Sequence, residues 1–225
     1  MSQDQGKILS FSNGLKELSQ NGMKWWFNEF LPYRLTETFP DYPHMDNPVA
    51  GIGCQASYDN ENTVIYFSKK DYRVRTAFKD RLEYNSVTNE FLLDGKIDIK
   101  LGDPGFFEDA SWTISYDPKN EFFISFHDWF PDLYIPTKNT FLTTKGNGMW
   151  KHNYICDNYC NYYGVDKPFE VEFPLVTGQT VMTLKSFEYV LECYKREPQD
   201  CIDQFQVLDF NFDRAVVYNP EQVSG

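Results

Sequence analysis

The sequence contains no long hydrophobic run. Its 225 residues have a mean hydropathy of −0.54, and no stretch of about 18 consecutive apolar residues occurs, so we expect no membrane-spanning helix. The first residues, MSQDQGKILSFS, lack the basic and apolar regions of a secretory signal peptide. Phosphate-binding loops of the GxGxxG or Walker type are also missing, and we predict no bound cofactor.

Basic residues are the second scarce class. Lysine and arginine number 21 against 33 aspartate and glutamate residues, which gives a net charge of −12. The only local basic cluster consists of Lys69, Lys70, Arg73 and Arg75. Because nucleic-acid binding needs clustered Lys and Arg that displace counterions from phosphates, we expect no nucleic-acid partner.

Cysteines are few and odd in number: Cys54, Cys156, Cys160, Cys193 and Cys201. Without a secretion signal, this count predicts reduced thiols in a protein made in a cytoplasm. A turn at residues 197–200 would bring Cys193 and Cys201 close together, so one disulfide stays open as an alternative.

One group of residues has the types that bind metals. His152, Cys156 and Cys160 are spaced by four residues, which on a helix would place them on one face. A fourth ligand is missing, and the Asn- and Tyr-rich segment around them is a poor helix former. We therefore predict no metal site and interpret the thiols as buried side chains.

Aromatic residues, by contrast, are abundant, with 20 Phe and 15 Tyr available to fill a core. A helix is predicted over residues 20–31, with Ser19 as its cap and Pro32 at its end. Four apolar residues in this segment follow a helical spacing: Met23, Trp26, Phe27 and Phe30.

Turn signals between apolar runs predict β-hairpins. Asn13-Gly14 and Asp94-Gly95 each separate two such runs, and both dipeptides favour the tight turns of hairpins. A longer strand–turn–strand pattern also recurs: SYDNEN at 57–62, SYDPKN at 115–120 and, more weakly, EYNSVTN at 83–89. An Asp or Asn at the start of such a turn bonds the backbone two residues on, and an Asn near its end tolerates the left-handed conformation.

Together these patterns predict a mainly β fold. Repeated hairpins are typical of β-propeller blades or of sandwich layers. We expect a propeller-like β-hairpin region over residues 1–128, which carries the short amphipathic helix and a loop at 39–48. An aromatic, loop-rich connector over 129–168 and a small β-sandwich-like C-terminal region over 169–225 are expected to follow.

No group of residues predicts catalysis. His127 and Asp128 are adjacent at the end of a predicted strand, but neighbours in a strand point to opposite faces, and no nucleophile motif accompanies them. Acidic residues are so numerous that carboxylate pairs of the glycosidase kind arise by chance. We therefore predict no catalytic residue.

Aromatic side chains on the surface are the remaining candidates for binding. Trp25 lies off the apolar stripe of the predicted helix, and Trp129 and Phe130 form a corner before Pro131. Together with Trp150, these residues are the interface candidates, since aromatic anchors dominate protein interfaces. For each of them, burial within the same fold is the interpretation that we prefer.

Several longer phrases resemble one family. They are ISFHDWFPDLYIPTKNTFLTTKGNGMWKHN (124–153), PFEVEFPLVTGQTV (168–181), CIDQFQVLDFNFDRAVVYNPEQVSG (201–225), FSNGLKELSQNGMKWWF (11–27) and YDNENTVIYFSKKDY (58–72). These segments look like the large structural proteins of crAss-like bacteriophages known as stabilization proteins. Those proteins resemble the muzzle component at the distal end of the short tail.

The resemblance implies a non-catalytic protein of the virion tail, made in the host bacterial cytoplasm, that contacts other tail proteins and copies of itself. It defines no functional residue. Family members are much longer, so we expect this chain to be a piece of a longer protein. Two other functions stay open: a carbohydrate-binding module that recognises a bacterial surface glycan, and a propeller-type glycan hydrolase.

Overall fold

The structure, a computed structural model, describes the residues in these ranges: 1–2, 5–11, 14–46, 49–152, 160–172, 186, 188–191, 193–196, 205–208 and 212–217. The protein is mainly β, as predicted, with 42% strand and 8% helix in several small sheets. The chain divides into two compact units, Met1–His152 and Asn153–Gly225. None of the helices in the described ranges has the length and the apolar character that a membrane crossing requires.

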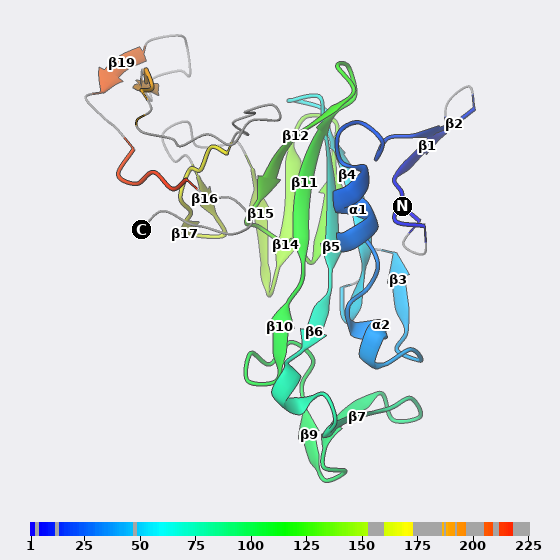
Figure 1. Ribbon diagram of the computed structural model, residues 1–225. Helices are drawn as coiled ribbons and strands as arrows, with labels where there is room; N and C mark the ends of the chain where they lie inside the picture. The colour runs from blue at the N-terminus through cyan, green and yellow to red at the C-terminus, as the bar shows by residue number, and fades with distance from the viewer. Residues whose placement is uncertain are drawn as a thin grey trace. The chain divides into compact units, whose positions relative to one another are not determined.

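The largest sheet of the first unit has five strands in the order β12-β11-β5-β4-β3 (Figure 1). These strands are β3 (His44–Asp46), β4 (Ile52–Asp59), β5 (Val64–Lys70), β11 (Trp112–Asp117) and β12 (Phe122–His127). Neighbours are antiparallel except β3 and β4, which are parallel. The expected loop over 39–48 therefore contains a short edge strand, because its residues find backbone partners along β4.

The repeated turns have the chemistry that their sequence predicts. The Asp59 carboxylate accepts a hydrogen bond from the Glu61 backbone N–H (3.0 Å), and Asp117 accepts one from the Lys119 N–H (2.7 Å). The side chain of Asn85 accepts its bond in the same way from the residue two positions on. The predicted bond from turn side chain to backbone is thus confirmed in all three copies.

The turn residue that adopts the left-handed conformation, with a positive φ angle, is not the predicted one in two of the three copies. It is Asn89 in the weakest copy (φ 60°) but Thr63 (φ 55°) and Glu121 (φ 61°) in the other two. In those copies it lies one residue after the Asn that sequence reasoning selected. Thr63 is β-branched, so its backbone is strained at this φ.

The repeats are not successive propeller blades. β5 pairs with β11 along five residue pairs, from Ile65↔Tyr116 to Lys69↔Trp112, which joins the two strongest copies into one sheet. No propeller or closed sheet occurs in the part of the chain that the structure describes. The sequence pattern specified the hairpins correctly, but it carried no information on which hairpin edges would meet.

Between β5 and β11 the chain forms a smaller lobe. The β5–β11 pair continues as a two-stranded ribbon of β6 and β10, and three strands at its tip form an antiparallel meander (Figure 1). The elements are β6 (Tyr72–Val74), the 3-10 helix η1 (Thr76–Phe78), β7 (Leu82–Asn85), β8 (Glu90–Leu93), β9 (Ile97–Ile99) and β10 (Phe107–Asp109). Positive φ angles at Asp94 and Gly95 confirm the predicted tight turn between β8 and β9.

The N-terminal hairpin and the helix form close to the expected places. The elements are β1 (Leu9–Phe11), β2 (Leu15–Glu17), α1 (Lys24–Phe30) and α2 (Leu35–Thr38). The helix is shorter than the predicted 20–31, and Met23 rather than Ser19 precedes its first turn. Ser19 cannot cap α1, because its hydroxyl accepts a hydrogen bond from the Ile8 N–H (3.3 Å) and donates one to Glu17 (3.0 Å).

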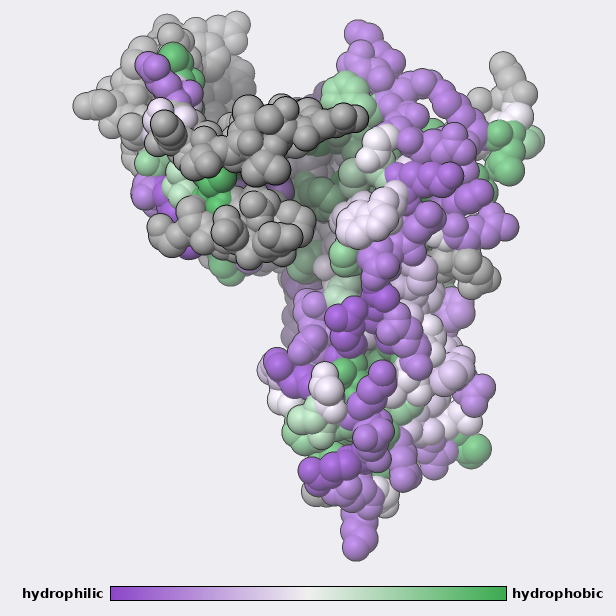
Figure 2. All heavy atoms as spheres, viewed as in Figure 1, coloured by the Kyte–Doolittle hydropathy of each residue, from purple (hydrophilic) through white to green (hydrophobic). Residues whose placement is uncertain are grey.

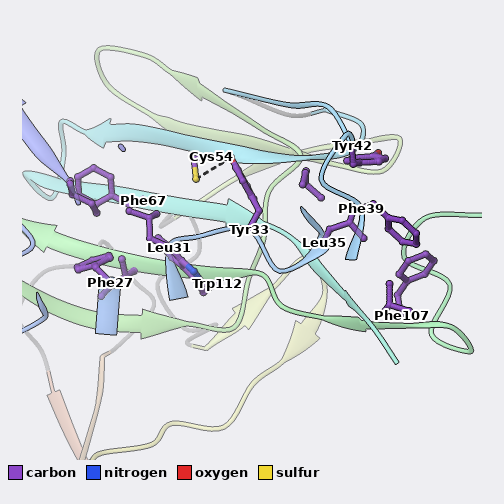
Figure 3. Close-up of a cluster of buried hydrophobic side chains, with 14 of the residues drawn as sticks. Phe27, Leu31, Tyr33, Leu35, Phe39, Tyr42, Cys54, Phe67, Phe107 and Trp112 are labelled. Atoms are coloured by element: carbon purple, nitrogen blue, oxygen red, sulfur yellow. Dashed lines mark hydrogen bonds between the residues drawn. The ribbon is translucent and has the colours of Figure 1, made fainter. Parts of the chain in front are cut away.

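One face of the central sheet packs against α1. Phe27 and Leu31 are fully buried and lie next to Phe67 and Trp112 of the sheet (Figure 3). The ring centroids of Phe27 and Trp112 are 6.0 Å apart. The same cluster continues beyond α2 to Phe107 on the ribbon, so the sheet and the lobe share one hydrophobic core.

The opposite face of the sheet packs against a second sheet of three strands. These are β13 (Leu133–Pro136), β14 (Phe141–Lys145) and β15 (Gly148–Lys151). Buried hydroxyl groups link the two layers: Ser68 Oγ lies 2.7 Å from both Thr113 Oγ1 and Tyr134 OH. A side-chain amide adds a further bond, from Gln55 Nε2 to the Pro131 carbonyl (2.9 Å).

The segment 129–168 therefore differs from the expected loop-rich connector. Along β14, Phe141 and Thr143 are buried while Leu142 and Thr144 are half-buried, the alternation of a strand with one face covered. Proline, lysine and glycine at the turns hid this alternation at the sequence level.

The described residues of the second unit form two short antiparallel pairs. These are β16 (Asn161–Tyr162) with β17 (Val165–Asp166), and β18 (Cys193–Arg196) with β19 (Phe205–Leu208). Residues 169–172, expected to start a β region, have no regular secondary structure. Cys156, Cys201, the Cys193 side chain and most of the predicted C-terminal β region lie outside the described residues.

Candidate interaction surface

The four predicted interface residues do not gather at one place. Trp25 is 73% exposed on α1, on one side of the central sheet. Trp129, Phe130 and Trp150 belong to the part of the chain that forms the second sheet, on the other side. Phe130 is half-buried and Trp150 is 37% exposed, whereas Trp129 is buried at 3% exposure. Of the two interpretations of Trp129, burial within the fold is the correct one.

Trp129 is buried because it fills the space between the two sheets. Its ring centroid lies 5.2 Å from that of Tyr66 and 5.0 Å from that of His152, while its carbonyl accepts a hydrogen bond from Thr113 Oγ1 (2.7 Å). His152 Nε2 lies 2.7 Å from Thr143 Oγ1, and burial lowers the pKa of His152. These residues form a second aromatic core rather than a binding surface.

A different set of apolar side chains reaches the surface on β12 and α1. We call it the β12–α1 strip, and its members are Phe122, Ile124, Phe126, Trp25 and Phe30. Phe126 lies on the α1 face of β12, whereas Phe122 points to the opposite face, because its neighbour Phe123 contacts Phe27 of the helix. Figure 2 shows residues of low polarity gathered over these elements among hydrophilic neighbours. The exposure of the three β12 residues was not predicted, because the run FFISF does not alternate between polar and apolar residues. The absence of any charge over those five residues is the signal that would have identified them.

Trp26 joins the two parts of the strip. Its ring centroid lies 5.0 Å from that of Phe126 on β12 and 5.2 Å from that of Phe30 on α1. Trp25 in turn contacts Phe30 edge-on at 6.2 Å. Trp26 is itself anchored on the buried Trp112, with ring centroids 5.0 Å apart, so the core holds the strip in place.

β12 is also the last strand of its sheet on one side. Within the described ranges no strand pairs with its outer edge. Natural edge strands usually carry charges, prolines or bulges that prevent pairing with other chains. β12 carries no charge or proline between Phe122 and Phe126, but it has a bulge that leaves Ile124 without a partner residue on β11.

A groove of about 450 Å³ lies beside the strip. Trp26, Phe30 and Phe126 line it on one side. Charged residues at the ribbon and the end of α1 contribute the rest of its lining, among them Arg34, Arg73, Glu108 and Asp109. Arg34 forms ion pairs with Glu29 and Glu37, so its charge is already balanced.

Lys69, which lines this groove, belongs to a buried ion pair. Lys69 and Asp71 are 1% and 0% exposed, and their charged atoms are 2.7 Å apart. Lys69 Nζ also donates to the carbonyls of Phe30 (2.8 Å) and Pro32 (2.6 Å), which uses all three of its hydrogens. Burial lowers the pKa of Lys69, and the charge of Asp71 acts in the opposite direction. The pair fastens the end of α1 to the sheet and leaves no donor for a ligand.

Asp71, the acidic partner of Lys69, also accepts hydrogen bonds from the backbone. Its carboxylate accepts hydrogen bonds from the backbone N–H groups of Arg34 (2.6 Å), Leu35 (3.3 Å) and Tyr72 (2.9 Å). The first two belong to the start of α2, whose N–H groups lack partners within the helix. One carboxylate therefore balances Lys69 and caps α2.

His127 lies at the end of β12 and contacts the rings of Tyr66 and Trp129. Burial lowers the pKa of His127 to about 4, although the neighbouring Asp128 acts in the opposite direction. In the residues that the structure describes, His127 Nε2 has no hydrogen-bond partner. Across the same ranges, no group of three His, Cys, Asp or Glu side chains is placed to hold a metal ion.

Comparison of the chain with models of protein families, with curated proteins and with solved structures finds no match.

Proposed function

We propose that the chain is a non-catalytic structural component of a bacteriophage tail that acts through protein–protein contacts in an assembled ring. The observation that carries the proposal is the β12–α1 strip. It combines five exposed apolar side chains with an uncharged edge strand on a chain of net charge −12. Exposed apolar patches of this kind mark surfaces that other proteins cover.

Two further observations support this function. One of the phrases that resemble tail proteins of crAss-like phages, residues 124–153, includes the last four residues of β12. The strip is also rigidly supported, since Trp26 and Trp112 connect it to the main core. A preformed apolar surface loses little conformational entropy on association.

In this proposal each chain supplies one blade-like sheet, instead of the several blades predicted from the sequence. β4, β5, β11 and β12 form a four-stranded antiparallel meander, the strand arrangement of a single blade. In an assembled ring each copy would contribute one such sheet. The ring would then close between chains and not within one chain.

Mass spectrometry of purified particles tests the proposal. Peptides of this chain should be present in virions of the phage that encodes it, in fixed ratio to other tail proteins. Virions assembled with Ile124→Asp should contain less of the protein, whereas Val87→Asp, at a 92% exposed position on the distant lobe, should be incorporated normally. Absence of the protein from virions would overturn the proposed function.

The groove favours one alternative, a module that binds a bacterial surface glycan. Aromatic rings on one side and side chains of Arg73, Glu108 and Asp109 on the other offer stacking surfaces together with hydrogen-bond donors and acceptors. Trp129, one of the interface candidates from the sequence, is buried and is not available for stacking on a sugar.

A glycan array with matched variants distinguishes this alternative. Specific binding that Arg73→Ala abolishes and Arg81→Ala preserves would favour glycan recognition, because Arg73 lines the groove and Arg81 lies in the lobe. An array without signal for the folded protein would count against it.

A further inference from the structure

We propose that two copies of this chain associate through β12, which pairs antiparallel with β12 of the second copy and joins the two central sheets. The inference rests on the proposed function, and this twofold contact is separate from the contacts that would close a ring. Edge strands with free backbone groups are ready templates for this kind of pairing.

The two edges of the central sheet are not equivalent. β3, at one edge, has only three residues and directly follows Pro43, which lacks a backbone N–H. β12, at the other edge, has six residues, without charge or proline between Phe122 and Phe126. Head-to-tail extension of the sheet through β3 is therefore disfavoured, and pairing of β12 with itself gives a closed twofold contact.

The absence of charge along β12 permits the approach of a second copy. Two chains of net charge −12 repel each other, so they approach best through an uncharged surface. Glu121 directly precedes β12 and Asp128 directly follows it, so antiparallel pairing places these carboxylates near each other at both ends of the contact. The Lys16–Glu121 ion pair balances one charge at each end.

The exposed area is sufficient for a weak dimer. Four aromatic side chains contribute most of this area: Phe122, Phe126, Trp25 and Phe30. Their exposed fractions lie between 37% and 73%. With an area of roughly 200 Å² for each side chain, they present about 400 Å² per copy. Two copies then bury about 800 Å² from these rings, and Ile124 with the paired backbones brings the total to about 1,000 Å². This is the lower limit of specific interfaces, so we expect a dimer that dissociates on dilution.

The bulge at Ile124 sets the extent of the pairing. It increases the local twist and interrupts the regular backbone ladder, so pairing stays confined to a few residues. A contact of this kind closes on two copies and does not continue into a fibre, because β3 offers no matching edge.

Sedimentation velocity on the full chain, from low to high micromolar concentration, is the first test. The wild type should shift from monomer to dimer as its concentration rises. Ile124→Lys places a charge within the contact and should raise the dissociation constant about tenfold or more. The control Val87→Lys makes a similar apolar-to-lysine change at an exposed site on the lobe and should dimerise like the wild type.

Cross-linking provides a second test that does not require a destabilising charge. Under mild oxidation, Ile124→Cys should form covalent dimers above the wild-type background, and Val87→Cys should not. A wild type that stays monomeric at high micromolar concentration, or an Ile124→Lys variant that dimerises normally, would overturn the proposal. If such a monomer is nevertheless found in virions, the tail function stands and β12 binds a different tail protein.

Discussion

Replacing Asp71 with asparagine would remove the charge that balances Lys69 while almost preserving the shape of the side chain. Asp71 Oδ2 faces both Lys69 Nζ (2.7 Å) and the Arg34 N–H (2.6 Å), and Oδ1 faces two more backbone N–H groups. An asparagine has only one oxygen, so its amide hydrogens must point at a donor on one of the two sides.

The size of the effect follows from burial. Both partners are at most 1% exposed, so Lys69 would keep its charge without a counter-ion or lose its proton. Breaking a buried pair in this way costs about 3–5 kcal/mol of unfolding free energy. For a chain of this length the melting temperature should fall by about 6–20 °C.

The pH dependence provides an independent check of this reasoning. Burial holds the pKa of Lys69 below its ordinary value, so the unfolded chain binds this proton more tightly than the folded chain does. Because the charge of Asp71 raises the pKa of Lys69, the loss of this charge lowers the pKa of Lys69 in the folded chain further. Below the ordinary lysine pKa of about 10.4 the unfolded chain binds this proton more tightly, so the stability of Asp71→Asn should rise as the pH increases toward that value.

Thermal unfolding followed by circular dichroism measures these effects, with Asp94→Asn as the matched control. Asp94 pairs with Arg81 at the surface, where both side chains are more than half exposed, so its replacement should leave the melting temperature unchanged. The double variant Lys69→Met/Asp71→Asn should recover part of the loss, because it leaves no uncompensated charge. Equal melting temperatures for Asp71→Asn and the wild type would refute the reasoning.

Two further predictions concern titration and backbone strain. Because the pKa of His127 is about 4 in the folded chain and near 6.5 when unfolded, the unfolded state binds more protons between these values, and stability should fall as pH decreases through this window. In His127→Gln, the unfolding free energy should fall less at low pH, by up to about 3 kcal/mol, as measured by urea unfolding at several pH values. If the unfolding free energies of the variant and the wild type change in parallel with pH, the assigned burial of His127 is wrong. Thr63→Asn should raise the unfolding free energy by about 0.5–1 kcal/mol, because Asn tolerates the left-handed conformation, while Thr88→Asn in the related turn, which has no positive φ, should have no effect. A loss of stability in Thr63→Asn would show that the strain is not relieved in this way.

Local features of the fold were predictable where a few neighbouring residues decide them. The hairpin at Asp94-Gly95 and the side-chain bonds of Asp59 and Asp117 follow from spacing and turn chemistry. The start of α1 was not predictable from Ser19, because Ser19 forms its bonds with the preceding hairpin.

Features that depend on distant partners could not be read from the sequence. Pairing of β5 with β11 joins residues more than 40 positions apart, and no turn signal records it. Burial of Trp129 depends on Tyr66 and His152, which approach it only after the two sheets meet. The β12–α1 strip was missed for the same reason, since Phe122 and Phe126 become a surface only when β12 ends its sheet.

The ribbon of β6 and β10 has a consequence for the order in which the chain folds. β5 and β11 can pair only after the intervening segment has closed on itself, and closing a long flexible loop costs entropy. The meander of β7, β8 and β9 consists of local contacts that form quickly, and it draws Val74 and Phe107 together. We expect the lobe to act as a folding nucleus from which the ribbon zips toward the central sheet, where β5 then pairs with the β11–β12 hairpin.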